Sequence, residues 1–412
     1  MPKNHALNLE KKIFQKDIIN RIKENSSNTS KPWVVELDPT TACNLACHGC
    51  ISANLLNQGG FKRERIKELA KEFHEMGVKA VVLIGGGEPM AHPEFGTIVD
   101  YFYEHDIHVG VTSNGTLIDK YLESLAYRTK WVRISVDAGS EEIFQQYRPH
   151  VSGKSQFNKV IDGMKKLSKI KKTKLGYSFL VLEKHGADRK GAEKGDNYVE
   201  TNATDIFKAA KIAKEIGCDY FEVKPSFDPF HFLNDTSKLM TNIIKSELDL
   251  CQDLKDENFN IISPYTLEKT MEGETKQDKE YSRCLTTELR TVLSPSGAYV
   301  CPYHRGNTNL KIGDPTVESF KDIWYGKTRK EIMEKLDPRK HCQFHCIRHK
   351  TNLELEDIKD DFDTVTTVEN FDRFIWLIKI VKIKKELFDR LKSQGNNIFI
   401  KSEKKVIGYD EF

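Results

Sequence analysis

The sequence lacks a long hydrophobic run: none of its 412 residues lies in a stretch approaching the ~20 apolar residues that cross a bilayer. The first residues, MPKNHALNLEKKIFQ, also lack the apolar core of a signal peptide. We therefore predict no membrane span and a cytoplasmic location.

Neither sign of charge is in excess. The 64 Lys and Arg residues nearly cancel the 61 Asp and Glu residues, which leaves a net charge of +3. This balance gives no whole-surface attraction to phosphate backbones or anionic lipid, so nucleic acid is not an expected partner. A hydrophobic content of 38% and a charged content of 30% suit a globular enzyme instead.

Cysteines are few, and most of them are grouped. The nine cysteines form one group of three, one group of four and two lone residues: Cys43, Cys47 and Cys50; Cys284, Cys301, Cys342 and Cys346; Cys218 and Cys251. Because a reducing compartment does not keep structural disulfides, the two groups are predicted to bind metal.

From residue 34 onward, short β-rich runs alternate with amphipathic stretches. Strands are expected near residues 34, 80, 108, 131, 174 and 219, and helices at 62–77, 94–105, 155–169 and 203–216. The alternation predicts an α/β fold, a full or partial (β/α)6 barrel with a parallel sheet inside and helices outside. Residues 184–197 have no periodicity and are predicted to form a mobile loop at a strand end.

Changes in composition divide the chain into five predicted segments. These are an N-terminal helical extension (1–32), the core barrel (33–230), a helical linker (231–283), a small α+β cysteine-bearing domain (284–350) and a helical tail (351–412). Residues 371–391 of the tail are amphipathic enough to dock on the core. A membrane-surface helix is the alternative, but its acidic residues would oppose anionic lipid.

The segment ELDPTTACNLACHGC places Cys43, Cys47 and Cys50 in a C-x3-C-x2-C array after the first strand. Three thiolates on one loop can each bind one iron of a cubane cluster and leave the fourth iron open. A closed zinc site that adds His48 is the alternative. This array resembles that of the radical S-adenosylmethionine (SAM) superfamily. The resemblance implies a SAM-cleaving [4Fe-4S] cluster on these cysteines, SAM as a cofactor and a flavodoxin- or ferredoxin-like electron donor.

Further similarity to that family lies at the ends of the next strands. The turn Gly85, Gly86, Gly87, Glu88 resembles the family's Gly-Gly-Glu contact to the SAM amino group, although an ordinary strand-to-helix turn is the alternative. Four more residues resemble its contacts to the SAM carboxylate and ribose: Ser113, Asn114, Ser135 and Asp137. Turn chemistry alone also explains the Asn-Gly pair at 114. Lys224 could hold an anionic group at the barrel mouth or be a surface lysine.

The second group, Cys284, Cys301, Cys342 and Cys346, surrounds a Gly-turn hairpin and a helix and ends in a C-x3-C pair. This order resembles the twitch module, a short relative of the SPASM module, and implies one fully ligated auxiliary [4Fe-4S] cluster. Structural zinc is the alternative. Any of three nearby histidines could replace a cysteine: His304, His345 and His349. The RGN segment at 305 and RHKTN at 348 are interpreted as hydrogen-bonding supports.

The reaction is less determined than the cofactors. Cys218 is expected in the core, and so is Cys251, although Cys251 is the one thiol we nominate as a hydrogen donor for an epimerisation. Oxidation is placed slightly ahead, because a fully ligated auxiliary cluster can accept an electron from the substrate radical. A small polar, carbohydrate-type metabolite is the expected substrate, since about 33 residues before the first strand are too few for a peptide-recruiting domain. A maturase of ribosomal peptides and a non-catalytic metal scaffold are the alternatives.

Overall fold

The computed structural model describes residues 31–185, 199–226, 238–274, 277–342 and 344–361. The expected helices at 6–25 and 371–391, and residues 186–197 of the expected loop, lie outside the described residues. The first two residues of that loop, 184 and 185, are instead part of strand β6 (Glu183–His185), which pairs antiparallel with β7 (Val199–Thr201).

The six expected strands are present and lie side by side in one sheet. They are β1 (Val34–Leu37), β2 (Ala80–Leu83), β3 (His108–Ser113), β4 (Trp131–Ser135), β5 (Lys174–Val181) and β8 (Tyr220–Pro225). All five pairings between them are parallel, in the order β1-β2-β3-β4-β5-β8. The partial barrel predicted from the alternation is confirmed.

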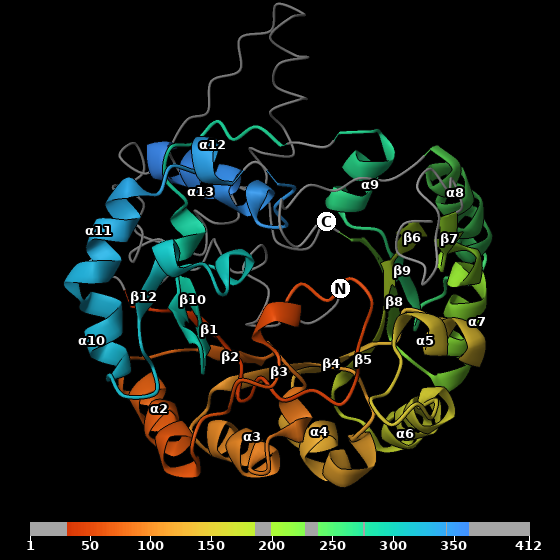
Figure 1. Cartoon of the computed structure of the whole chain (residues 1–412), viewed down its shortest axis with the longest axis horizontal. Helices are drawn as coiled ribbons and strands as arrows, with labels where there is room; N and C mark the ends of the chain where they lie inside the picture. The colour runs from red at the N-terminus through yellow and green to blue at the C-terminus, as the bar shows by residue number, and fades with distance from the viewer. Residues whose placement is uncertain (1–30, 186–198, 227–237, 275–276, 343, 362–412) are drawn as a thin grey trace, which may run out of the picture.

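Helices cover the outer side of this sheet (Figure 1). Four match the expected ones: α2 (Arg63–Glu75), α3 (Phe95–Glu104), α6 (Phe157–Ile170) and α7 (Ile206–Ile216). The short helices α4 (Leu122–Arg128) and α5 (Glu141–Tyr147) were not expected. In β4, Val132 and Ile134 are fully buried in the hydrophobic core, whereas the alternate residues Arg133 and Ser135 are only half-buried. The strands therefore present apolar side chains to the helices and several polar ones to the barrel interior.

The sheet continues beyond the six strands on both sides. The predicted helical linker contains α8 (Lys238–Gln252), α9 (Tyr265–Met271) and an unexpected strand, β9 (Asn260–Ile262), that pairs parallel with β8. At the other edge, β10 (Arg290–Ser294) pairs parallel with β1. Strands β11 (Gly297–Tyr299) and β12 (Lys311–Gly313) follow β10 in antiparallel order. The hairpin of the cysteine-bearing segment is therefore part of the barrel sheet.

The remainder of that segment is helical. Its helices are α10 (Phe320–Tyr325), α11 (Lys327–Lys335) and α12 (Pro338–His341), and α13 (His349–Asp361) begins at its end and continues into the predicted tail. Buried ion pairs join the segment to β1: Glu36 contacts both Arg290 and Arg348, the latter at 2.7 Å, and Asp38 contacts Arg305 at 2.6 Å. Among the described helices, none is both long and apolar enough to cross a membrane.

Candidate active site

The loop that follows β1 carries Cys43, Cys47 and Cys50 and is held by the segment after α5. Val151 N–H donates a hydrogen bond to the Asn44 carbonyl (3.0 Å), and Ala46 N–H donates to the Pro149 carbonyl (2.8 Å). Gly49 takes a positive φ of 66°, which glycine adopts without strain. The backbone of the loop is therefore fixed by its neighbours.

The three thiols are half-buried and close enough to influence one another. Burial raises the pKa of Cys43 and raises that of Cys47 to about 11. A bound metal would deprotonate such thiols. The zinc alternative needs His48 as a further ligand, but its Nε2 lies 3.1 Å from the Glu183 carbonyl oxygen.

The glycine turn after β2 packs directly on the start of this loop. A Cβ on Gly87 would lie 2.5 Å from the carbonyl carbon of Thr41, and one on Gly85 would lie 1.9 Å from the Gly87 oxygen. Glu88 N–H donates to the Ala42 carbonyl at 2.8 Å. These contacts leave no room for side chains at Gly85 and Gly87, which is a packing reason for glycine at both positions.

Gly86 connects the turn to the C-terminal segment. Its N–H donates to the carboxylate of Asp38, which is fully buried and paired with Arg305. Burial raises the pKa of Asp38 to about 6, against the opposing effect of Arg305. Arg305 thus has the supporting role expected of the RGN segment, and its partner is Asp38, directly after β1.

Glu88 is buried and bonded to the end of β3. Its Oε1 accepts from Ser113 Oγ at 2.8 Å and from Met90 N–H at 3.0 Å, and its Oε2 accepts from Asn114 N–H at 2.7 Å. Burial raises the pKa of Glu88, and these three donors oppose the rise. Both carboxylate oxygens therefore accept hydrogen bonds from the protein, and Ser113 donates one of them.

The Asn114 side chain extends the same network to the cysteine loop. Its Nδ2 donates to Asn44 Oδ1 at 2.8 Å, and its Oδ1 accepts from Thr116 Oγ1 at 2.7 Å. Asn44 Nδ2 in turn donates to Thr116 Oγ1 at 2.8 Å. Asn44 stands directly after Cys43, so the end of β3 helps to fix the cysteine loop.

Asp137 is paired with Arg148, a residue that the sequence analysis did not single out. Asp137 has a positive φ of 57°, is 2% exposed, and forms an ion pair with Arg148. Its Oδ1 also accepts from Leu180 N–H at 2.7 Å. Although burial lowers the pKa of Arg148, the nearby Cys47 and Asp137 more than offset this, so its pKa is raised. A permanent cation thus lies beside the first cysteine group, on the segment that the Leu45–His150 bridge pairs with the cysteine loop.

Ser135 and Lys224 face the barrel interior. Ser135 is half-buried at the end of β4 and pairs with Ser178 of β5. Lys224 is half-buried on β8, 3.7 Å from the Glu222 carboxylate. Burial lowers the pKa of Lys224 to about 8. Of the two readings of this lysine, the structure supports the interior one.

The second cysteine group lines a single cavity of about 390 Å³, part of it open solvent. Cys284, Cys301, Cys342 and Cys346 all contribute to its wall. Among the described residues, no three His, Cys, Asp or Glu side chains lie close enough to hold one metal ion. The four thiols nevertheless line the same cavity.

Polar residues support this cavity. Asn352 bonds Thr286 N–H through Oδ1 at 2.9 Å and lies 3.4 Å from the Cys284 sulfur through Nδ2. Two of the nearby histidines have partners elsewhere: His345 Nε2 lies 2.6 Å from the Glu274 carbonyl, and His349 Nδ1 lies 3.2 Å from Tyr281 Oη. Only His304 of the three lines the cavity, with Nε2 3.5 Å from the Cys342 sulfur.

The two lone cysteines are in the hydrophobic core, as the apolar pattern around them indicated. Cys251 is fully buried at the end of α8, and burial raises its pKa to about 12. Cys218 is 4% exposed just before β8. A thiol enclosed in this way is poorly placed to donate hydrogen to a substrate, which speaks against Cys251 as the hydrogen donor.

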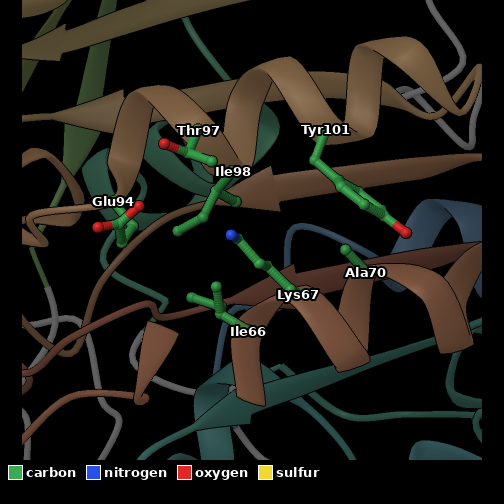
Figure 2. A pocket seen from close by; sticks show the side chains of 7 residues that line it. All are labelled: Ile66, Lys67, Ala70, Glu94, Thr97, Ile98 and Tyr101. Atoms are coloured by element: carbon green, nitrogen blue, oxygen red, sulfur yellow. The ribbon is translucent and has the colours of Figure 1, made fainter. Parts of the chain in front are cut away.

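A second hollow lies outside the barrel, between α2 and α3 (Figure 2). It encloses about 200 Å³, part of it open solvent, and its lining includes Ile66, Ala70 and Ile98. None of the predicted site residues lines it. This hollow is therefore not part of the candidate site.

The family model described as the radical SAM superfamily matches residues 37–183. These residues form a radical SAM domain. They contain the first cysteine group, the glycine turn and the ends of β3 and β4. A radical SAM domain uses a [4Fe-4S] cluster and SAM, so these cofactors belong to this part of the chain.

Curated relatives of the radical SAM domain have different activities. The chain is 32% identical over 145 residues to a probable GTP 3',8-cyclase of Archaeoglobus fulgidus, which covers 35% of this chain and 47% of that protein. It is 30% identical over 140 residues to the mycofactocin maturase MftC of Mycobacterium tuberculosis, covering 33% and 34%. The chain thus spans less than half the length of these relatives.

A solved structure shows the same fold over a longer stretch. Streptococcus suis SuiB, solved with its precursor peptide SuiA, matches 80% of this chain and 73% of its own with a TM-score of 0.56. Sequence identity is 16%, so the likeness concerns the fold alone. It extends well beyond the matched radical SAM domain.

Proposed function

We propose that Cys43, Cys47 and Cys50 hold the SAM-cleaving cluster and that this chain abstracts a hydrogen atom from its substrate. The convergence of the cysteine loop, the glycine turn and the end of β3 through Glu88 carries the proposal. When bound, the cluster supplies an electron that cleaves SAM to a 5′-deoxyadenosyl radical. Three half-buried thiols on one fixed loop suit a cluster with one open iron.

The chain's own residues would position SAM beside that iron. Gly85, Gly86 and Gly87 let the turn pack closely on the cysteine loop, which brings its backbone groups to the SAM site that we propose. Glu88 is a positioning residue, because its carboxylate fixes Ser113 and Asn114. Arg148, held by Asp137 beside Cys47, offers a cation to a carboxylate at this end of the barrel. Ser135 remains a candidate for a contact to the ribose.

For the second site, we propose an auxiliary [4Fe-4S] cluster on Cys284, Cys301, Cys342 and Cys346. Four thiols around one cavity match the four irons of a cubane. The positive side chains of Lys279 and Arg348 would balance part of the thiolate charge. Full protein ligation leaves no open iron, which favours electron transfer or a structural role.

Iron and sulfide content tests both assignments. After anaerobic reconstitution, the wild type should hold about eight irons, and variants that replace either cysteine group with Ala should each hold about four. The control replaces Cys218 with Ser, which should keep about eight. Zinc in place of the auxiliary iron, or equal iron in all three preparations, would contradict the assignment.

The substrate is proposed more broadly than the cofactors. The similarity to a peptide maturase supports peptide modification as strongly as any observation supports a carbohydrate-type metabolite. Oxidation stays ahead of epimerisation because Cys251, the nominated hydrogen donor, is enclosed in the core. Turnover in heavy water separates the two outcomes, since epimerisation yields a deuterated isomer and oxidation yields a product two hydrogens lighter. SAM cleavage itself would contradict a purely structural scaffold.

A further inference from the structure

Three charged side chains lie on the inner face of the barrel, near its catalytic end. Strand register puts Ser135, Ser178 and Glu222 at one level, on β4, β5 and β8. Arg133 lies one level deeper, and Lys224 one level nearer the strand ends. The group formed by Arg133, Glu222 and Lys224, here called the interior triad, is therefore directly below the strand ends that form the proposed SAM site.

One carboxylate serves both cations of the interior triad. Glu222 Oε2 lies 3.1 Å from Arg133 Nη1 and 3.7 Å from Lys224 Nζ. The side chains of Arg133, Glu222 and Lys224 are 25%, 16% and 26% exposed, so solvent reaches all three. The triad carries two positive charges and one negative charge.

Arg133 is oriented by its neighbours and has donor capacity left. Its Nη2 donates to Thr112 Oγ1 at 3.3 Å, and its guanidinium lies 5.7 Å from the centre of the Trp131 ring. Its buried Nε has no hydrogen-bond partner within the described part of the chain. Opposite it, Gly176 has no side chain, and a Cβ there would lie 2.1 Å from the Tyr220 ring. The glycine lets that ring lie across β5 towards the triad.

Two other interior carboxylates already have arginine partners. Glu36 is close enough to raise the pKa of Arg133, but it forms ion pairs with Arg290 and Arg348. Asp137 acts on Lys224 but pairs with Arg148. Within the described residues, these pairs leave the interior triad with one positive charge in excess.

We propose that Arg133 and Lys224 bind an anionic group of the substrate, a carboxylate or a phosphate, inside the barrel. Hydrogen bonds from charged donors to such groups are the strong ones in proteins. The proposal rests on the proposed function, because it places the anion next to the SAM site. It narrows the substrate to a molecule that carries a negative charge, whether a metabolite or an acidic peptide.

Binding of inorganic phosphate and of glutarate to the reconstituted, SAM-saturated enzyme tests this by anaerobic calorimetry. Saturation with SAM keeps the probes out of the SAM site. Replacing Lys224 with Gln should lower the affinity for whichever anion binds by about tenfold, which is the loss expected for one charge-assisted hydrogen bond. Replacing Glu222 with Gln should tighten it several-fold, since a competing negative charge is removed.

Opposite signs in these two variants separate binding from structural damage, which would weaken both. Lys224→Arg should keep most of the affinity. The matched control is Lys174→Gln at the far end of β5, where Lys174 is 51% exposed and pairs with Asp219. That variant should bind like the wild type.

The two probes assign the group: phosphate binding alone indicates a phosphorylated substrate, and glutarate binding alone indicates a carboxylate. Binding of neither probe, or equal binding by the Lys224→Gln and Lys174→Gln variants, overturns the inference. A wild type that cleaves SAM but binds neither probe refutes this inference and leaves the proposed function standing. A wild type that fails to cleave SAM refutes the proposed function itself.

Discussion

Replacing Glu88 with Gln tests the site at the residue that joins its parts. The carboxylate accepts three hydrogen bonds, from Met90 N–H, Ser113 Oγ and Asn114 N–H, and is 1% exposed. An amide has only one oxygen, and each backbone donor faces a different carboxylate oxygen. In either orientation of the amide, its NH2 group therefore faces one of the two backbone N–H groups.

The magnitude follows from that arrangement. A buried donor left unsatisfied costs roughly 1–3 kcal/mol. Because the substitution also removes a buried charge whose pKa is raised by burial, part of this cost is offset. We expect a net loss of about 1–2 kcal/mol and, for a chain of this size, a melting temperature lower by roughly 1–3 °C.

The assay is thermal unfolding of the reconstituted protein, with SAM affinity measured on the same sample. Because both oxygens bond protein donors and the amide keeps part of these bonds to Ser113 or Asn114, SAM binding should weaken only slightly, by less than the loss of a direct contact. The control is Glu94→Gln, which removes a partly exposed ion pair with Arg63 at 3.3 Å and should shift the melting temperature only slightly. An unchanged melting temperature together with about tenfold weaker SAM binding would refute the reasoning and make Glu88 a direct SAM contact.

Two further predictions concern charged groups. Arg148→Met should destabilise the protein by roughly 3–5 kcal/mol in urea unfolding, because it leaves the buried Asp137 unpaired; adding Asp137→Asn should recover much of the loss, and a single variant as stable as the wild type would contradict this. Lys224, faced by Arg133, Glu222 and Asp137, has a pKa lowered to about 8 by burial, so it loses its proton as pH rises through that value. Affinity for the bound anion should therefore fall between pH 7 and 9 in the wild type and stay level in Lys224→Arg, as calorimetry at each pH would show.

Much of the fold could be predicted from local pattern. The strands near 34 and 80 are short, mostly apolar and buried, and α2 and α6 have clear apolar faces, so their positions follow from periodicity. Strand β9 has only three residues, too few for a periodic signal. The pairing of β10 with β1 joins segments about 250 residues apart, and their sequences carry no sign of it.

The candidate site could be predicted where the ligands are close in sequence and their spacing is typical of a cluster, as for Cys43, Cys47 and Cys50. It was not predictable where a side chain reaches across the fold. Arg305 bonds Asp38 over 267 positions, and Ser113 bonds Glu88 over 25. Such partners depend on the sheet order, so Glu88 seemed a ligand contact from sequence although the structure gives it protein partners.

The most direct test of the central claim is 5′-deoxyadenosine formation from SAM and dithionite, measured by mass spectrometry. The wild type should form it, and the variant with Ala at Cys43, Cys47 and Cys50 should form none while keeping about four irons at the second site. Replacing Cys218 with Ser should leave formation intact. Undiminished 5′-deoxyadenosine from the triple variant would contradict the account.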